Sequence, residues 1–251
     1  MDRTLPRRPA RRLLRVLVAL AVALVLLVVA FLVYAHDVMP GDREAALTAW
    51  EDDAVSIRDA GEAIVMTPTG ETSGVGLVVV PGAKVDPWAY LATFREVVAA
   101  GTTVVVTKPT LSLAILDRTP LTTYTALVPE VGTWAVGGHS LGGVRACALA
   151  ADDEVAGLLL LGSYCLEDLS GTDLDVLSLA GSEDGLSTPD DVASRRGTLP
   201  ADADLVVLGG VAHAQFGAYG EQPGDGTPTV TDDEARTLVA DEVLAWADGL
   251  R

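Results

Sequence analysis

Basic side chains are scarce in this sequence, and lysine almost absent. Its 251 residues include 17 Lys and Arg, of which only two are lysine, against 35 Asp and Glu. There are only three histidines. Residues 1–36 contribute +5 to the net charge of −18, so the remainder of the chain carries −23. Nucleic acid and anionic lipid would repel so acidic a domain, and we expect no nucleic-acid partner.

Cysteine is nearly as rare, with Cys147 and Cys165 as the only two. No group of histidines and cysteines has the spacing of metal ligands, so the sequence predicts neither a metal nor another cofactor. Outside the cytoplasm a cysteine pair favours a disulfide. Cys147 falls in an expected helix and Cys165 follows the next expected strand, and their heights along the sheet need not match. The sequence leaves this pairing open.

One long apolar run is present, at the N-terminus. Residues 16–35 contain no charge, and at about 1.5 Å per residue a helix of this length matches the roughly 30 Å core of a bilayer. The arginines before it predict a cytoplasmic tail (1–15), a transmembrane signal anchor (16–35), a connecting segment (36–61) and an extracytoplasmic domain (62–251). Within the connecting segment we expect a helix over residues 42–61. The alternative is a cleaved signal peptide, although the apolar cores of such peptides are usually about 7–15 residues long.

Strand-like and helix-like segments alternate through residues 62–251. Residues 76–80 are an uninterrupted apolar run, which is typical of a strand buried on both faces, and residues 102–106 form the next expected strand. Asp86 and Pro87 begin an amphipathic helix, and Thr231 with Glu234 forms a capping box for the last one. We therefore expect an α/β fold with a mostly parallel sheet covered on both faces.

A G-x-S-x-G motif, Gly138-His139-Ser140-Leu141-Gly142, lies between a strand-like and a helix-like run. A serine on such a tight strand-to-helix turn projects from the backbone, and the flanking glycines let the turn close. The pentapeptide alone is weak evidence, because glycine and serine are common in loops. Its setting makes Ser140 the candidate nucleophile.

A serine nucleophile needs a base, and His213 is the candidate. His36 adjoins the apolar run, and strand alternation directs the side chain of His139 away from that of Ser140. His213 follows the strand-like residues 204–208, at the end of a strand where α/β proteins bind their ligands. On its own, a loop histidine is more often a solvated surface residue.

A carboxylate between serine and histidine in the chain would complete a triad. The apolar strand 175–181 is followed by Ser182-Glu183-Asp184-Gly185, which makes Asp184 the candidate and Glu183 the alternative. An ordinary polar turn would use the same residues. The motif, the acid and the base occur in the required order, each after a strand.

Pro81-Gly82-Ala83-Lys84 follows the strand 76–80. Gly82 permits a close approach of the backbone, so the N–H of Ala83 can pair with the N–H of Leu141 as an oxyanion hole. A plain Pro-Gly turn is the simpler alternative. Lys84 and Lys108, both just past strand ends, are candidate substrate-binding residues or partners of a nearby carboxylate. Gln215 and Phe216, close to His213, are further candidates for substrate binding.

These stretches resemble the alpha/beta-hydrolase superfamily, and most of all the dienelactone-hydrolase-like, alpha/beta hydrolase fold-5 group. The resemblance covers about residues 62–250 and lies in Val80 to Pro87, Val106 to Pro109, Gly137 to Gly143 and His213 to Gly217. It implies an alpha/beta-hydrolase fold. Only residues 164–174 lie between the strand after the nucleophile helix and the next strand, which is too short for a folded cap, so we expect no large cap domain. Ala83 departs from the expected second glycine but retains the N–H.

The residues and the resemblance together predict a membrane-anchored serine hydrolase that cleaves an ester or related acyl bond of a small molecule. An acyltransferase using the same triad is the alternative within the enzyme class. A catalytically idle binding protein with this fold is the alternative outside it. The sequence identifies neither the substrate nor the oligomeric state.

Overall fold

The computed structural model describes residues 8–250, which form two units, up to Asp37 and from Val38 onward. The first unit is helix α1, Arg8–His36, and its segment Arg12–His36 is long and apolar enough to cross a membrane. A signal sequence has the same property. The predicted tail lies partly outside the described residues.

The second unit contains one eight-stranded sheet in the order β1-β2-β4-β3-β5-β6-β7-β8. Strands β3 to β8 run parallel, whereas β1 and β2 pair antiparallel at one edge. The strands are β1 (Val55–Asp59), β2 (Ala63–Pro68), β3 (Val75–Val80), β4 (Thr103–Thr107), β5 (Thr133–His139), β6 (Gly157–Leu161), β7 (Asp175–Gly181) and β8 (Asp204–Leu208). The predicted α/β fold with a mostly parallel sheet is confirmed.

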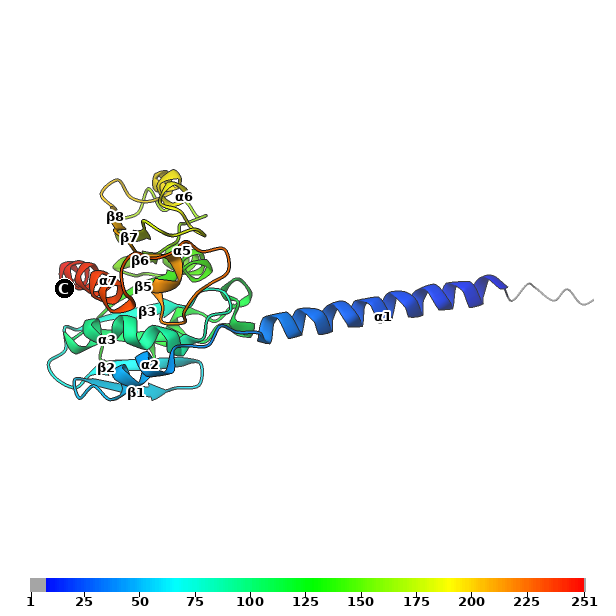
Figure 1. Ribbon diagram of the computed structural model, residues 1–251, viewed down its shortest axis with the longest axis horizontal. Helices are drawn as coiled ribbons and strands as arrows, with labels where there is room; N and C mark the ends of the chain where they lie inside the picture. Colours follow the sequence, from blue (N-terminus) through cyan, green and yellow to red (C-terminus); the bar gives the residue numbers. More distant parts are fainter. Residues whose placement is uncertain (1–7, 251) are drawn as a thin grey trace, which may run out of the picture. The chain divides into compact units, whose positions relative to one another are not determined.

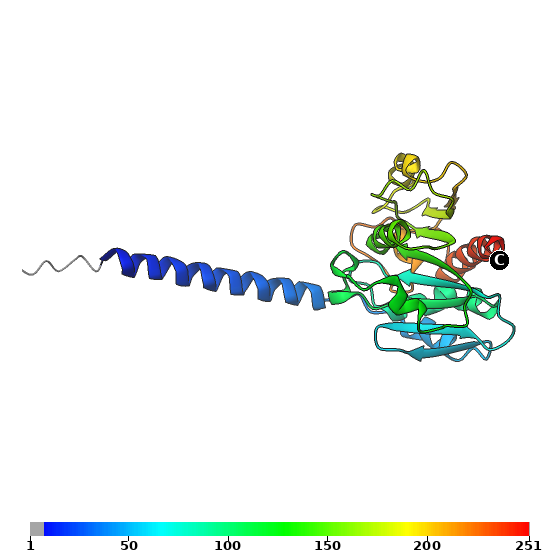
Figure 2. The same cartoon turned by 180° about the vertical axis from the view of Figure 1, so that it is seen from behind.

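Helices cover both faces of the sheet. In Figures 1 and 2, α3 and α7 cover one face and α5 covers the other. The helices are α2 (Arg43–Trp50), α3 (Leu91–Ala99), α4 (Leu121–Thr125), α5 (Leu141–Asp152), α6 (Pro189–Ser194) and α7 (Asp232–Gly249). Short 3₁₀ turns are η1 (Pro87–Tyr90), η2 (Thr110–Ser112), η3 (Ala114–Leu116), η4 (Arg196–Thr198) and η5 (His213–Phe216).

The interior strands bury nearly all their side chains, because both faces are covered. Every residue of β3, β4 and β6 is buried, as is expected for strands covered on both faces. Two separate apolar clusters result. One packs Phe94 of α3 and Val239 of α7 against the sheet, and the other packs Ala146 of α5 on the opposite face.

The expected connecting helix over residues 42–61 is only partly present. Only Arg43–Trp50 is helical, with Asp42 accepting a hydrogen bond from the N–H of Ala45 as N-cap. Residues Val55–Asp59 form the edge strand β1 instead. Their sequence, Val-Ser-Ile-Arg-Asp, alternates apolar and polar residues, and this period of two is that of a half-buried strand.

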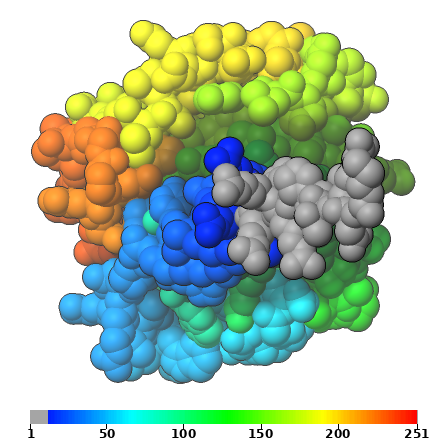
Figure 3. All heavy atoms as spheres, turned by 90° about the vertical axis from the view of Figure 1, so that its right-hand side faces the viewer, coloured from blue at the N-terminus to red at the C-terminus, as the bar shows by residue number. Residues whose placement is uncertain are grey.

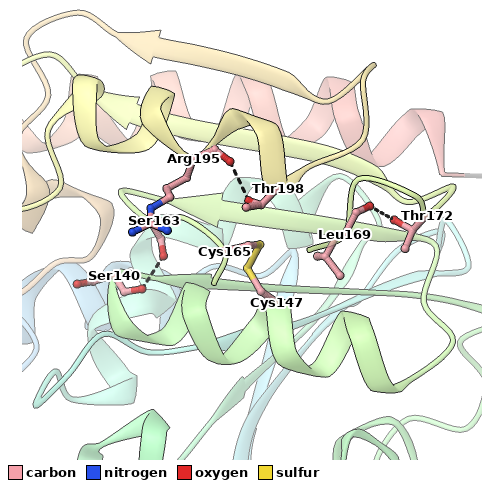
Figure 4. The surroundings of a disulfide bond; sticks show 8 residues. All are labelled: Ser140, Cys147, Ser163, Cys165, Leu169, Thr172, Arg195 and Thr198. Atoms are coloured by element: carbon pink, nitrogen blue, oxygen red, sulfur yellow. Dashed lines mark hydrogen bonds between the residues drawn. A yellow bond between two sulfur atoms is a disulfide. The ribbon is translucent and has the colours of Figure 1, made fainter. Parts of the chain in front are cut away.

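The two cysteines, whose pairing the sequence left open, form a disulfide. Cys147 of α5 and Cys165 after β6 have Cα atoms 5.5 Å apart, so their heights along the sheet do match. Figure 4 shows the bond joining α5 to the segment after β6. The helix α5, which contains Cys147, begins directly after Ser140.

Candidate active site

Ser140 lies on a strained turn between β5 and α5. Its φ of 53° and ψ of −124° are unusual for a residue with a side chain. A Cβ on Gly138 would lie 2.3 Å from the carbonyl carbon of Gly142, and a Cβ on Gly142 would lie 2.1 Å from the oxygen of Val80. Glycine at both positions therefore lets the turn close and holds Ser140 in this conformation.

The backbone of Ser140 is tied to β6. Its N–H donates to the oxygen of Leu161 at 3.0 Å, and its own oxygen accepts a 2.7 Å hydrogen bond from the Ser163 hydroxyl. Figure 4 shows this second bond. Ser163 is buried, and a Cβ on Gly143 would lie 2.4 Å from its hydroxyl oxygen. The nucleophile turn is thus fixed at both ends.

His213 and Asp184 form a buried pair after β8 and β7. His213 Nδ1 lies 2.7 Å from Asp184 Oδ2, and both side chains are almost fully removed from solvent. The other carboxylate oxygen, Oδ1, accepts hydrogen bonds from the N–H groups of Leu186 and Ser187 at 2.8 and 2.7 Å. Glu183, the alternative acid, instead accepts an exposed bond from the hydroxyl of Ser182.

The nucleophile turn and the His213–Asp184 pair meet at Gly162. A Cβ there would lie 2.9 Å from Asp184 Oδ2 and 3.0 Å from His213 Nδ1, so only glycine fits. Gly162 follows Leu161, the residue that accepts the N–H of Ser140. No hydrogen bond joins Ser140 Oγ to His213 among the residues described, and such bonds are often long in enzymes without substrate.

His139, expected to point away from Ser140, is fully buried behind the turn. Its ring centroid lies 4.5 Å from that of His213, and its Nδ1 lies 2.9 Å from the hydroxyl oxygen of Tyr90. Burial, and then the neighbouring His213, lower the pKa of His139 well below its usual value. His139 is therefore a neutral residue that packs against the candidate base.

Tyr90 connects this histidine to the loop after β3. Its hydroxyl oxygen accepts the N–H of Gly82 at 2.8 Å, which leaves its hydrogen to donate to His139 Nδ1. Burial raises the pKa of Tyr90, an effect that the Gly82 bond opposes, so the phenol stays protonated. A Cβ on Gly82 would lie 2.9 Å from His139 Nδ1, which explains the glycine.

The two N–H groups expected to form an oxyanion hole belong to the residues directly after Gly82 and Ser140. Ala83 comes directly after Gly82, and Leu141 is the first residue of α5. Neither N–H donates a hydrogen bond within residues 8–250.

The four expected substrate-binding residues have different surroundings. Lys108 Nζ lies 2.6 Å from Asp59 Oδ1, at the end of the edge strand β1. The backbone of Lys84 adopts a φ of 59°, and its N–H donates to the oxygen of Ser112. The Gln215 amide bonds the backbone of Ala212 and Val230 and the Asp232 carboxylate.

Phe216, the fourth of these residues, is fully buried and lies with its ring centroid 5.9 Å from that of His139. Its position favours packing beneath the histidines.

Three residues that support this site could not be predicted from the sequence. Tyr90, Ser163 and Asp225 each bond to a candidate catalytic loop from outside the motifs. Tyr90 and Ser163 sit in ordinary helical and strand-end sequence. Asp225 lies in the segment 222–229, whose prolines and glycines indicated only a loop near His213.

No group of three or more histidine, cysteine, aspartate or glutamate side chains in the described part of the chain could hold a metal ion. The chemistry available at this site is that of a hydroxyl, an imidazole, a carboxylate and backbone N–H groups. This set is suited to acyl transfer through a serine.

Comparison with family models decides the affiliation of the chain. Residues 76–237 match the model of the alpha/beta hydrolase family. The chain belongs to this family. A comparison with curated proteins found no match. The matched region extends from the strand before the loop of Gly82 to the last helix, and includes Ser140, Asp184 and His213. Family membership supports hydrolase activity in general.

Proposed function

We propose that this protein is a serine hydrolase that cleaves an ester or a related acyl bond through Ser140, His213 and Asp184. The observation that carries the proposal is the buried 2.7 Å contact between His213 Nδ1 and Asp184 Oδ2 beside the strained Ser140 turn. A buried, oriented imidazole next to a serine on such a turn favours nucleophilic chemistry.

The reaction follows from the positions of these groups. Ser140 Oγ attacks the acyl carbon, and Nε2 of His213 takes the hydroxyl proton. Asp184 accepts the Nδ1–H hydrogen bond and stabilises the imidazolium. The N–H groups of Ala83 and Leu141 receive the oxyanion. His213 then gives its proton to the leaving alkoxide, and water repeats the sequence to release the acid and free Ser140.

The short connection after β6 supports an open site. Only residues 162–174 separate β6 from β7, and they contain no helix, so no folded cap covers the site there. An open site offers little apolar surface to a long acyl chain. We therefore propose short, soluble acyl esters as substrates. A sharp rate increase once substrate forms an emulsion, or a clear preference for long chains, would contradict this.

Acyl transfer, in which an alcohol or amine replaces water, remains the alternative within the same chemistry. Product analysis in the presence of added alcohols separates the two. Reaction with a fluorophosphonate, which forms a covalent adduct with an activated serine, separates both from an idle binding protein.

We further propose that α1 anchors the protein in the cell membrane with the domain outside the cytoplasm. The length and apolarity of Arg12–His36 and the preceding arginines support this topology. A reporter fused after Arg251 should be active only outside the cytoplasm, and the full chain should stay with the membranes. A released fragment beginning near His36 would favour the cleaved signal peptide instead.

A further inference from the structure

Asp225 lies between η5 and α7, and its carboxylate accepts backbone hydrogen bonds from two separate loops. Oδ1 accepts the N–H of Gly185 and the N–H of His213, both at 3.1 Å. Oδ2 accepts the N–H of Ala214 at 2.8 Å. Gly185 directly follows Asp184, so one carboxylate binds the backbone of the acid loop and of the base loop.

These bonds act close to the candidate catalytic side chains. The two loops are also joined nearer to their strands, where Ser182 N–H donates to Leu208 and Glu183 N–H donates to Val211, each at 2.9 Å. Those bonds fix the start of each loop. The bonds to Asp225 fix the backbone of His213 itself and of Gly185 and Ala214, which directly follow Asp184 and His213. Hydrogen bonds to a charged acceptor are the stronger kind.

The loop that carries Asp225 is packed directly against the acid loop. A Cβ on Gly226 would lie 1.8 Å from the oxygen of Glu183, and a Cβ on Gly185 would lie 2.7 Å from the N of Gly226. Only glycine at both positions allows this contact between backbones. In Figure 3 the segments that follow β7 (yellow) and β8 (orange) lie next to each other on this face.

We propose that Asp225 is a positioning residue for the reaction, which sets the register between Asp184 and His213. The inference rests on the proposed serine-hydrolase function. Asp225 bonds the backbone of the two loops rather than substrate or the reacting atoms. Its loss lets the imidazole move relative to Ser140, and a misplacement of about 1 Å in an active site can cost on the order of 100-fold in rate.

The test compares three variants of the full-length protein, purified in detergent: Asp225→Ala, Asp225→Asn and Asp191→Ala. Asp191 is the matched control, because its carboxylate accepts the backbone N–H and the hydroxyl of Thr188 at the start of α6, outside the site. Rates are expressed per active site titrated with a fluorophosphonate. Loss of folded protein therefore does not register as loss of rate.

We expect Asp225→Ala to lower kcat by about 100-fold with little change in KM, because the residue orients catalytic groups without binding substrate. Asp225→Asn keeps one acceptor oxygen and should lose about 10-fold. Asp191→Ala should keep the wild-type kcat. The downfield proton resonance of the His213–Asp184 hydrogen bond should weaken in Asp225→Ala only.

Two failures are distinguishable. A wild-type protein that no fluorophosphonate labels would overturn the proposed function itself. A labelled wild type with Asp225→Ala and Asp225→Asn at the wild-type kcat per titrated site would overturn the role of Asp225. Should Asp225→Ala not fold, the kcat of Asp225→Asn decides: a loss relative to Asp191→Ala supports the role, and an unchanged value contradicts it.

Discussion

The nucleophile turn and the loops that carry Asp184 and His213 differ in the interaction that contributes most to holding each of them. At the turn, glycines remove the Cβ atoms that would collide with Val80 and Gly142, and this close packing of backbones adds to the two hydrogen bonds that hold the backbone of Ser140. In the loops after β7 and β8, hydrogen bonds join residues up to 40 positions apart, as from Gly185 to Asp225. The turn should therefore respond to added volume, and the loops to lost acceptors.

Asp184→Asn removes the charge that orients His213, and it should have the largest effect on rate. We expect turnover to fall by about 10⁴-fold, as it does when a serine protease loses its orienting carboxylate. Glu183→Gln is the matched control and should be nearly silent, because Glu183 bonds only the exposed hydroxyl of Ser182. Steady-state hydrolysis measures both. The opposite pattern would assign the role to Glu183.

Gly142→Ala adds a side-chain atom at the nucleophile turn, the region compared with the loops. Its Cβ would lie 2.1 Å from the oxygen of Val80, and neither backbone can yield without opening the turn. We expect a loss of about 4 kcal/mol in the free energy of unfolding, or roughly 10³-fold in the equilibrium. Gly132→Ala, where a Cβ meets nothing within 4 Å, should change it by less than about 0.5 kcal/mol. Equal denaturation midpoints for the two variants would refute the steric explanation.

The disulfide joins α5, the helix that begins after Ser140, to the segment after β6. Replacing both Cys147 and Cys165 by serine reopens a loop of sequence separation 18 and should cost about 3 kcal/mol, or roughly 100-fold in the unfolding equilibrium. The rate per folded molecule should stay the same, because neither sulfur contacts Ser140. Thermal unfolding with and without a reductant provides the measurement. A wild-type protein indifferent to the reductant would contradict the bond.

Tyr90→Phe should have a smaller effect, because the hydroxyl that it removes bonds the loop of Gly82 and His139 rather than a candidate catalytic side chain. Without the hydroxyl the buried N–H of Gly82 loses its acceptor, and Ala83 next to it is held less firmly. A fall of about 10-fold in kcat is expected from the loss of one such bond. Tyr124→Phe removes a buried hydroxyl that bonds Asp117 away from the site, and should lower stability without changing kcat. Parallel losses in both variants would mean that Tyr90 is merely structural.

The fold followed from the sequence because its signals are local. Continuous valine and leucine runs marked the parallel strands, and the caps at Asp86 and Thr231 marked helix starts that the structure has. The strand Val55–Asp59 was missed because a helix was expected over all of residues 42–61. Its apolar and polar alternation was present but spans only five residues.

In the candidate site, too, local sequence signals were predictive and contacts between distant loops were not. The positions of Ser140, Asp184 and His213 could be chosen from strand ends and chain order alone. The ties of Tyr90 to Gly82 and of Asp225 to Gly185 could not, because they depend on how distant loops pack. The surroundings of Gln215 and Phe216 were equally hard to predict. Their closeness to His213 in the sequence suggested contact with substrate, but both side chains are buried and contact other parts of the protein.

The most direct test of the whole account is covalent labelling of Ser140. The full-length protein is treated with a fluorophosphonate, and the modified peptide is identified by mass spectrometry. We expect a single adduct on Ser140 in the wild type, and neither an adduct nor ester hydrolysis in Ser140→Ala, whose thermal stability should be nearly unchanged. An unlabelled wild type, an adduct on another residue, or retained hydrolysis in Ser140→Ala would contradict the assignment of Ser140 as the nucleophile.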